Sequence, residues 1–120
     1  MPVRSLHSSV LVWPNANAVD QAIRQWVREV LPVRPEVVRV GYFGSYARGD
    51  WGVGSDLDLL IVVERAEEPF ERRAVRWDVT KLPVPAEALI YTVQEWDSLA
   101  KGTRFGQMVK QQAVWIYQKV

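Results

Sequence analysis

The chain has 120 residues, almost half of them hydrophobic, and its 15 basic and 14 acidic side chains give a formal net charge of +1. This length suits one compact domain with a buried core, so we expect a single domain over residues 1–120. A charge so near zero gives no sign of a non-specific nucleic-acid-binding protein, which normally carries a clear basic excess. Because cysteine is absent, disulfides and thiolate metal sites are excluded, which agrees with a cytoplasmic location.

Residues 1–14 are predicted to form an extended N-terminal arm. Its apolar run, residues 10–13, is too short for a membrane span, so we expect no membrane partner. Asn15 or Asn17 is a suitable N-cap for an amphipathic helix over residues 18–31. Its apolar face is formed by Ala18, Ala22, Ile23, Trp26, Val27 and Val30.

Two predicted strands enclose a glycine-rich loop. The first covers residues 37–43 and leads into Gly44-Ser45 and a short helical turn. The loop covers residues 49–55, and the second strand covers residues 56–63. This second strand is apolar on both faces after Asp58, which indicates a sheet covered on both sides.

The second half of the chain alternates helices and strands. A helix is predicted over residues 67–78, with buried positions at Phe70, Ala74, Val75 and Trp77. A strand over residues 86–93, short helices over 94–100 and 103–111, and a final strand over 113–117 follow. This order predicts an α+β protein with a small mixed or antiparallel sheet and helices packed on it.

Asp56 and Asp58 form the first half of a candidate site. Residues two apart on a strand face the same side, about 6.5–7 Å apart, so both carboxylates project together. Two neighbouring carboxylates in an apolar strand repel each other and lose hydration. A divalent cation removes this conflict, and magnesium prefers such oxygen ligands together with waters and phosphate oxygens.

Gly44 and Ser45 form the second half. Gly44 ends a strand and has no Cβ, so another group can approach its backbone closely. Ser45 begins a helical turn, where free N–H groups and its hydroxyl can hold a phosphate. The two halves together suit phosphoryl or nucleotidyl transfer, which needs mainly positioning and charge neutralisation by one or two ions.

The motifs GSYARG at residues 44–49 and SDLDL at residues 55–59 resemble the signature of the DNA polymerase β-type nucleotidyltransferases. The nearest branch is the minimal nucleotidyltransferase (MNT) family, which acts as antitoxins beside HEPN-domain toxins. The resemblance implies a polymerase β palm-like fold, two aspartates that hold magnesium and a glycine-serine turn that holds the triphosphate. It also implies transfer of a nucleoside monophosphate, with AMP from ATP expected, to a tyrosine of a HEPN-type partner.

The superfamily carries a third carboxylate on a neighbouring strand, which binds metal and accepts the proton of the attacking hydroxyl. The resemblance assigns this role to Glu87, with Asp78 as the alternative. The family usually has aspartate there, and glutamate is one methylene longer. Arg48 has two interpretations, a surface ion pair or a nucleotide-binding residue that neutralises phosphate charge.

Other functions stay open at this stage. A non-catalytic antitoxin would bind its partner and have a weak or inactive nucleotide site. This alternative stays open because position 87 is glutamate and not the usual aspartate. An antibiotic-modifying nucleotidyltransferase would need a further helical domain, for which this chain has no residues. A metal-stabilised structural protein would not explain Gly44-Ser45. Oligomer formation is compatible with every one of these functions.

Overall fold

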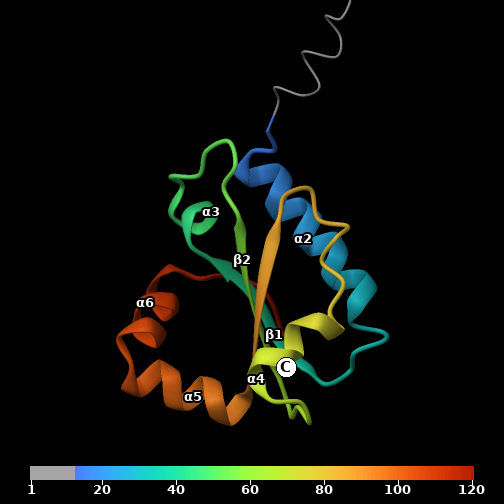
Figure 1. The fold of residues 1–120 in the computed structure, drawn as a ribbon, viewed down its shortest axis with the longest axis vertical. Coiled ribbons are helices and arrows are strands. Elements are labelled where there is room, and N and C mark those ends of the chain that lie inside the picture. The colour runs from blue at the N-terminus through green and yellow to red at the C-terminus, as the bar shows by residue number, and fades with distance from the viewer. Residues whose placement is uncertain (1–12) are drawn as a thin grey trace, which may run out of the picture.

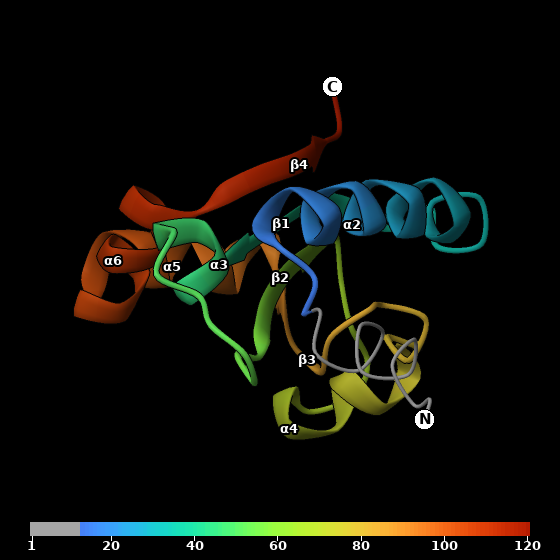
Figure 2. The ribbon, with the colours of Figure 1, turned by 90° about the horizontal axis from the view of Figure 1, so that it is seen from above.

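A four-stranded mixed sheet forms the centre of the computed structural model, which describes residues 13–120. The strands lie in the order β3–β2–β1–β4, which Figure 2 shows from above. β1 is antiparallel to β2 and β4, whereas β2 and β3 are parallel. The bounds are β1 Val37–Phe43, β2 Leu57–Val63, β3 Ala86–Thr92 and β4 Val114–Gln118. The mixed sheet predicted from the sequence is therefore confirmed, while the predicted arm lies almost wholly outside the described residues.

Helices cover both faces of the sheet. α2 (Ala16–Val30) lies on one face, and α5 (Val93–Gly102) and α6 (Arg104–Gln112) lie on the other (Figure 1). α3 (Ser45–Arg48) directly follows β1, and its buried residue Tyr46 belongs to the core beneath α2. Within residues 13–120, no helix combines the length and apolar character that a membrane span needs.

Local sequence signals explain where the helices begin. Asn15 caps α2, because its side-chain oxygen accepts a hydrogen bond of 2.8 Å from the Ala18 N–H. Thr92 and Glu95 form a reciprocal capping box at the start of α5. Thr103 caps α6 by accepting from the Gly106 N–H at 2.9 Å. These caps fix the helix starts within a few residues of the predicted positions.

The alternation of side chains along β2 separates two apolar cores. Leu57, Leu59 and Ile61 belong to the core beneath α2. Leu60 and Val62 belong to the core beneath α5 and α6. Since side chains two apart share a face, Asp58 points to the α5–α6 side of the sheet, at the start of the strand.

The segment over residues 67–78 differs from its prediction. It forms two short pieces, α4 (Phe70–Arg73) and the 3₁₀-helix η1 (Ala74–Arg76). Phe70 and Val75 were expected to be buried but are 40% and 83% exposed. The prediction was wrong because a change to 3₁₀ geometry after one turn rotates the later residues off the helical face. Of the four side chains expected inside, only Trp77 is buried.

Arg73 takes the buried position in this segment instead. It is 7% exposed, and its guanidinium donates to the Glu68 carbonyl at 2.9 Å and the Ile90 carbonyl at 3.1 Å. It also binds the Glu95 carboxylate at 2.6 Å. A buried charge is tolerated when it is paired and hydrogen-bonded in this way. Arg73 thereby fastens α4 to strand β3 and to the start of α5.

Candidate active site

Asp58 and Glu87 lie next to each other on the parallel strands β2 and β3. They are direct register partners, and neighbouring strands are about 4.8 Å apart. Both side chains therefore project from the α5–α6 face of the sheet. The sequence alone did not place Glu87 on this face, and the register puts it beside Asp58.

Asp56 lies just before the start of β2. The strand begins at Leu57 instead of the predicted residue 56, so Asp56 belongs to the preceding loop and is exposed. Its charge still acts on Asp58, because it contributes to the raised pKa of that residue. We call the three side chains Asp56, Asp58 and Glu87 the acidic end.

The pKa of Asp58 is raised above its ordinary value. Partial burial is the largest cause, and repulsion from Glu87 and then Asp56 adds to it. Arg48 is the basic group that opposes this shift. Within residues 13–120, no ion pair neutralises any carboxylate of the acidic end. The folded chain thus concentrates negative charge where a cation would be bound favourably.

Gly44 brings the backbone directly against this charge. β1 ends at Phe43, which is paired with Asp58, and Gly44 then adopts φ of 81°. A Cβ at this position would overlap Oδ2 of Asp58. Both the left-handed backbone and the contact with a carboxylate therefore require glycine. The glycine turn and the acid pair, which the sequence separates by a loop, form one site.

Ser45 opens the four-residue helix α3 beside this glycine. The N–H groups of Ala47 and Arg48 both donate to the Gly44 carbonyl. The N–H groups of Ser45 and Tyr46 therefore lie outside the hydrogen-bond ladder of the helix. Such free donors at the beginning of a helical turn are suited to an anion.

Arg48 and Asp78 have other partners in this structure. The Arg48 side chain is 46% exposed and pairs with Asp50 at 3.1 Å, as the surface interpretation expects. Asp78 is exposed, and its carboxylate accepts from the backbone and hydroxyl of Thr80. Its own carbonyl binds Trp26 of the α2 core. Asp78 thus lies towards α2 and does not belong to the acidic end.

Gln112 is a site residue that sequence reasoning missed. Its side-chain carbonyl accepts a hydrogen bond of 3.2 Å from the Gly44 N–H. The two residues are 68 positions apart, and no local pattern marks the last residue of an amphipathic helix as part of a site. Gln112 ties the end of α6 to the glycine turn.

Trp51, in the loop between the two motif halves, packs inside the loop region. Its ring stacks on Tyr46 with centroids 5.6 Å apart and planes 9° apart. The Tyr46 hydroxyl in turn accepts from the Trp13 indole at 2.8 Å. These contacts favour a structural role for Trp51 in holding the loop.

Magnesium fits the chemistry of the acidic end. Residues 13–120 contain no set of three or more acidic, histidine or cysteine side chains that could enclose a metal by themselves. Mg²⁺ does not need such a set, since it usually takes one or two carboxylates and completes its shell with waters and substrate phosphates. Asp58 and Glu87 supply two hard oxygen donors side by side, with the charge of Asp56 nearby.

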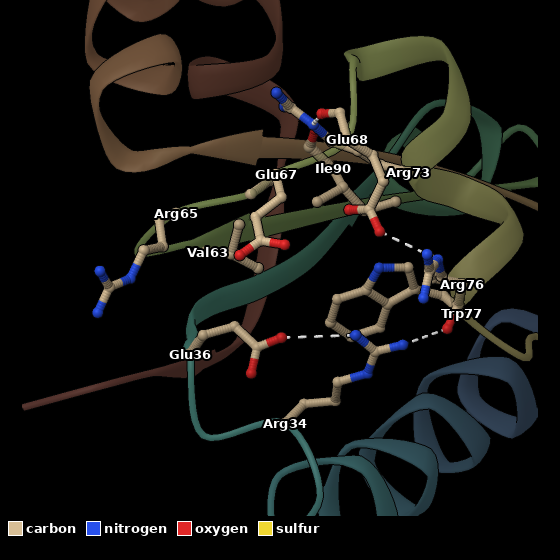
Figure 3. Close-up of a pocket in the computed structure, with 11 residues that line it drawn as sticks. Arg34, Glu36, Val63, Arg65, Glu67, Glu68, Arg73, Arg76, Trp77 and Ile90 are labelled. Atoms are coloured by element: carbon tan, nitrogen blue, oxygen red, sulfur yellow. Dashed lines mark hydrogen bonds and ion pairs between the residues drawn. The ribbon is translucent and has the colours of Figure 1, made fainter.

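A second concavity, which we call the arginine hollow, lies past the other end of β2 (Figure 3). Its volume is about 260 Å³. Arg34 pairs there with Glu36 at 3.5 Å, and Arg76 pairs with Glu68 at 3.0 Å (Figure 3). Arg73 is engaged by the contacts described above, and the fourth arginine, Arg65, is in none of the ion pairs within residues 13–120. Because three of its four arginines already have carboxylate partners, this hollow makes a weaker case for a ligand than the acidic end.

Comparison with known proteins agrees with this geometry. A family model described as a nucleotidyltransferase domain matches residues 22–111. A Sulfolobus solfataricus protein provisionally described as a nucleotidyltransferase has a TM-score of 0.63 and 21% identity, over 87% of this chain and 84% of that one. No curated protein sequence matches the chain.

Two toxin–antitoxin structures are also similar. One, solved with AMP-PNP, has a TM-score of 0.56 and 16% identity. The other is an MntA-HpeT mutant in which two aspartates are replaced by glutamates, with a TM-score of 0.53 and 13% identity. Each match covers 80% of this chain and 73% of the other chain. At these identities the likeness establishes the fold and nothing further.

Proposed function

Since this chain belongs to the nucleotidyltransferase domain family, we propose that it binds a magnesium–nucleoside triphosphate, with ATP the expected one, and transfers a nucleoside monophosphate to a hydroxyl group. The contact between Gly44 and Asp58 carries this proposal. It supports the proposal because the turn proposed to bind phosphate lies directly against a carboxylate proposed to bind the cation. A triphosphate with its metal requires both at once.

Each residue has a defined task in this reaction. The Ser45 hydroxyl and the free N–H groups at the start of α3 hold the triphosphate, and Arg48 adds positive charge. Asp56, Asp58 and Glu87 hold the metal, which when bound neutralises phosphate charge and orients the reacting oxygens. The acceptor oxygen forms a bond to the α-phosphorus, and the bond to pyrophosphate breaks. Glu87 accepts the proton of the acceptor hydroxyl.

The proposed acceptor is a tyrosine on a HEPN-type toxin partner. The toxin–antitoxin structures that share this fold support an antitoxin role. The structure solved with AMP-PNP supports a triphosphate as the substrate class. In the other structure, the two replaced aspartates are two positions apart, the same spacing as Asp56 and Asp58.

The test is an assay with labelled ATP, magnesium and purified candidate acceptors, including the all-helical product of any adjacent reading frame. Label should appear on the acceptor with wild-type protein and disappear when magnesium is chelated. The matched control is Asp50→Asn, which neutralises an exposed carboxylate of the same loop outside the acidic end and should retain transfer. Transfer that persists in an Asp56→Asn, Asp58→Asn double variant would contradict the assignment.

A second candidate is a non-catalytic antitoxin that neutralises its partner by contact. One observation favours it: the acidic end includes a glutamate where the family usually has aspartate, and its three carboxylates do not enclose a metal by themselves. Glu87→Gln separates the candidates. In an enzyme it should lower transfer by roughly 10²-fold, as expected for a lost general base, with triphosphate binding largely kept. In a contact antitoxin it should leave neutralisation of the toxin unchanged.

A further inference from the structure

A cationic cavity lies on the same side of the sheet as the acidic end, further along the strands. Its volume is about 270 Å³. We call it the Arg39 cavity, and its charged and aromatic lining residues are Arg39, Trp96, Asp97, Lys101, Lys110 and Trp115. Arg39 is paired with Val62, four residues along β2 from Asp58. The separation is therefore about 13 Å along the strand, too far for one metal ion to serve both places.

Two tryptophans hold the Arg39 side chain in place. Its guanidinium carbon lies 3.7 Å from the centre of the Trp115 ring, a cation–π contact. Trp115 meets Trp96 edge to face, with centroids 6.0 Å apart. A Cβ on Gly41 would come within 2.7 Å of the Trp115 ring, so glycine at that position lets the indole lie on β1. The guanidinium is thus presented by a rigid aromatic support.

Arg39 has no partner that explains this burial. Its Nε is the one buried side-chain nitrogen or oxygen within residues 13–120 that lacks a hydrogen bond. Burial also lowers the pKa of Arg39, although Asp97 acts in the opposite direction. The protein therefore supplies no hydrogen-bond acceptor for this Nε, a situation that is rare among buried polar atoms.

The other charges around the cavity are also uncompensated. The seven ion pairs within residues 13–120 include none of Arg39, Asp97, Lys101 and Lys110. Three cations against one carboxylate leave a surplus of two positive charges. Lys101 and Lys110 lie in the last turns of α5 and α6, where they also favour the helix dipoles. Arg39, in the middle of the sheet, has no such second role.

We infer that the Arg39 cavity binds a phosphate group of a small ligand, at a site separate from the acidic end. The surplus charge of two matches a phosphate dianion better than a single carboxylate. The two Nη groups of Arg39 are not among the buried unsatisfied atoms within residues 13–120 and have no hydrogen-bond partner there, so they can donate to phosphate oxygens. Pockets for drug-sized ligands have about 300–1,000 Å³. The smaller cavity suits free phosphate or the phosphate end of a nucleotide.

The test follows the indole N–H signals of Trp96 and Trp115 by two-dimensional NMR of the full chain. Inorganic phosphate is added at constant ionic strength with a chelator and without nucleotide, so the outcome is independent of the proposed transfer activity. Both signals should shift saturably. The signal of Trp51, next to the glycine turn, reports separately on phosphate bound at the acidic end.

Three sets of substitutions test which side chains bind the phosphate. Arg39→Lys keeps the charge but loses the planar fork, and should weaken phosphate binding at least about tenfold, the worth of a charge-assisted hydrogen bond. Lys101→Gln with Lys110→Gln changes exposed residues only, so a folded protein with weaker binding is expected. Lys119→Gln, which removes a lysine paired with Glu64 outside the cavity, is the matched control and should bind normally.

Comparing the affinities of AMP, adenosine and succinate with that of inorganic phosphate shows which kind of ligand the cavity prefers. A nucleotide source is supported if AMP binds more tightly than phosphate, and free phosphate is supported by the reverse. Adenosine that binds as well as AMP, or succinate that binds as well as phosphate, would overturn phosphate recognition. Shifts that never saturate would overturn the site itself. So would phosphate binding by Arg39→Lys and by the double lysine variant that is as tight as binding by the wild-type protein.

Discussion

The two ends of strand β2 differ in whether their charged side chains are paired. The acidic end at its start gathers three carboxylates that have no ion-pair partner among residues 13–120, and the pKa of Asp58 is raised by burial and then by repulsion from Glu87 and Asp56. The arginine hollow past its other end pairs three of its four lining arginines with carboxylates (Figure 3). Most charges at one end are paired within the folded chain, whereas the carboxylates at the other end are not.

This difference separates residues that stabilise the fold from residues that serve a ligand. Repulsion at the acidic end costs folding free energy, as is common where a site is arranged for function. The ion pairs of the arginine hollow act in the other direction, because Arg73 satisfies backbone carbonyls as well as a carboxylate. Substitutions at the two ends should therefore have opposite effects on stability and on nucleotide binding.

Asp58→Asn should give the largest functional effect. It removes a proposed metal ligand, and a metal contribution of several kcal/mol corresponds to roughly 10³-fold in rate. The same change should raise the melting temperature at pH 7, because it removes a partly buried charge that faces Glu87 and Asp56. The measurements are the transfer rate and thermal unfolding. A variant that is both inactive and less stable would contradict the comparison.

The pH dependence of Asp58→Asn has a defined sign. A carboxyl group with a raised pKa in the folded state favours folding in its protonated form, so the charged form costs stability as the pH rises through that pKa. The advantage of asparagine should therefore be largest at neutral pH. It should vanish below about pH 3.9, the ordinary value for aspartate.

Arg73→Met should give the largest loss of stability. Methionine keeps the apolar stem but removes the side-chain donor of the Glu68 and Ile90 carbonyls, at a cost of about 1–3 kcal/mol for a buried acceptor left unsatisfied. Urea unfolding measures this loss. Magnesium-linked nucleotide binding by the folded variant should be unchanged, because Arg73 does not contact the acidic end. Arg72→Met, at the exposed neighbouring position, is the control and should be nearly neutral.

Gly44→Ala should impair both properties to an intermediate degree. The backbone conformation, with φ of 81° and ψ of −154°, costs a non-glycine residue about 1–3 kcal/mol, and the new Cβ meets the Asp58 carboxylate. A second change, Asp58→Gly, should recover the part of the stability that is lost to this overlap. Calorimetric unfolding of the single and double variants gives the coupling between the two positions. Coupling near zero would mean that the contact is absent in solution.

Glu95→Gln should give the smallest effect. The hydrogen bond from Arg73 is the main cause that lowers the pKa of Glu95 to about 2. A lowered pKa stabilises the fold above the ordinary glutamate value near 4.3, and this contribution disappears as the pH falls towards about 2. Because the Glu95 side chain is 43% exposed, we expect about 1 kcal/mol or less at pH 7. The difference from wild type should shrink on acidification.

The sequence predicts most elements of this fold because short-range patterns determine them. Residues 37–43 form the predicted strand without change, since β-branched and aromatic side chains run up to a glycine. The motif glycine, serine and aspartates meet in space because the two strands that carry them are antiparallel neighbours. Here the local pattern and the tertiary structure agree.

Contacts between distant segments could not be predicted in this way. The bond from Gly44 to Gln112 and the burial of Arg73 depend on how α6 and α4 pack on the sheet. Neither residue type is unusual at a helix end, so periodicity gives no signal for them. The place of Glu87 was supplied by family resemblance, and the parallel register of β3 is what puts it beside Asp58.

The bond from Arg73 to the Ile90 carbonyl has a consequence for self-association. β3 is an outer strand of the sheet, and outer strands offer unpaired backbone groups to any other chain in an extended conformation. Arg73 occupies one of these acceptors from helix α4, which contacts β3. An approaching strand would have to displace a buried guanidinium held by three other oxygen atoms. Arg73, which anchors α4, therefore also hinders pairing of another strand with this edge of the sheet.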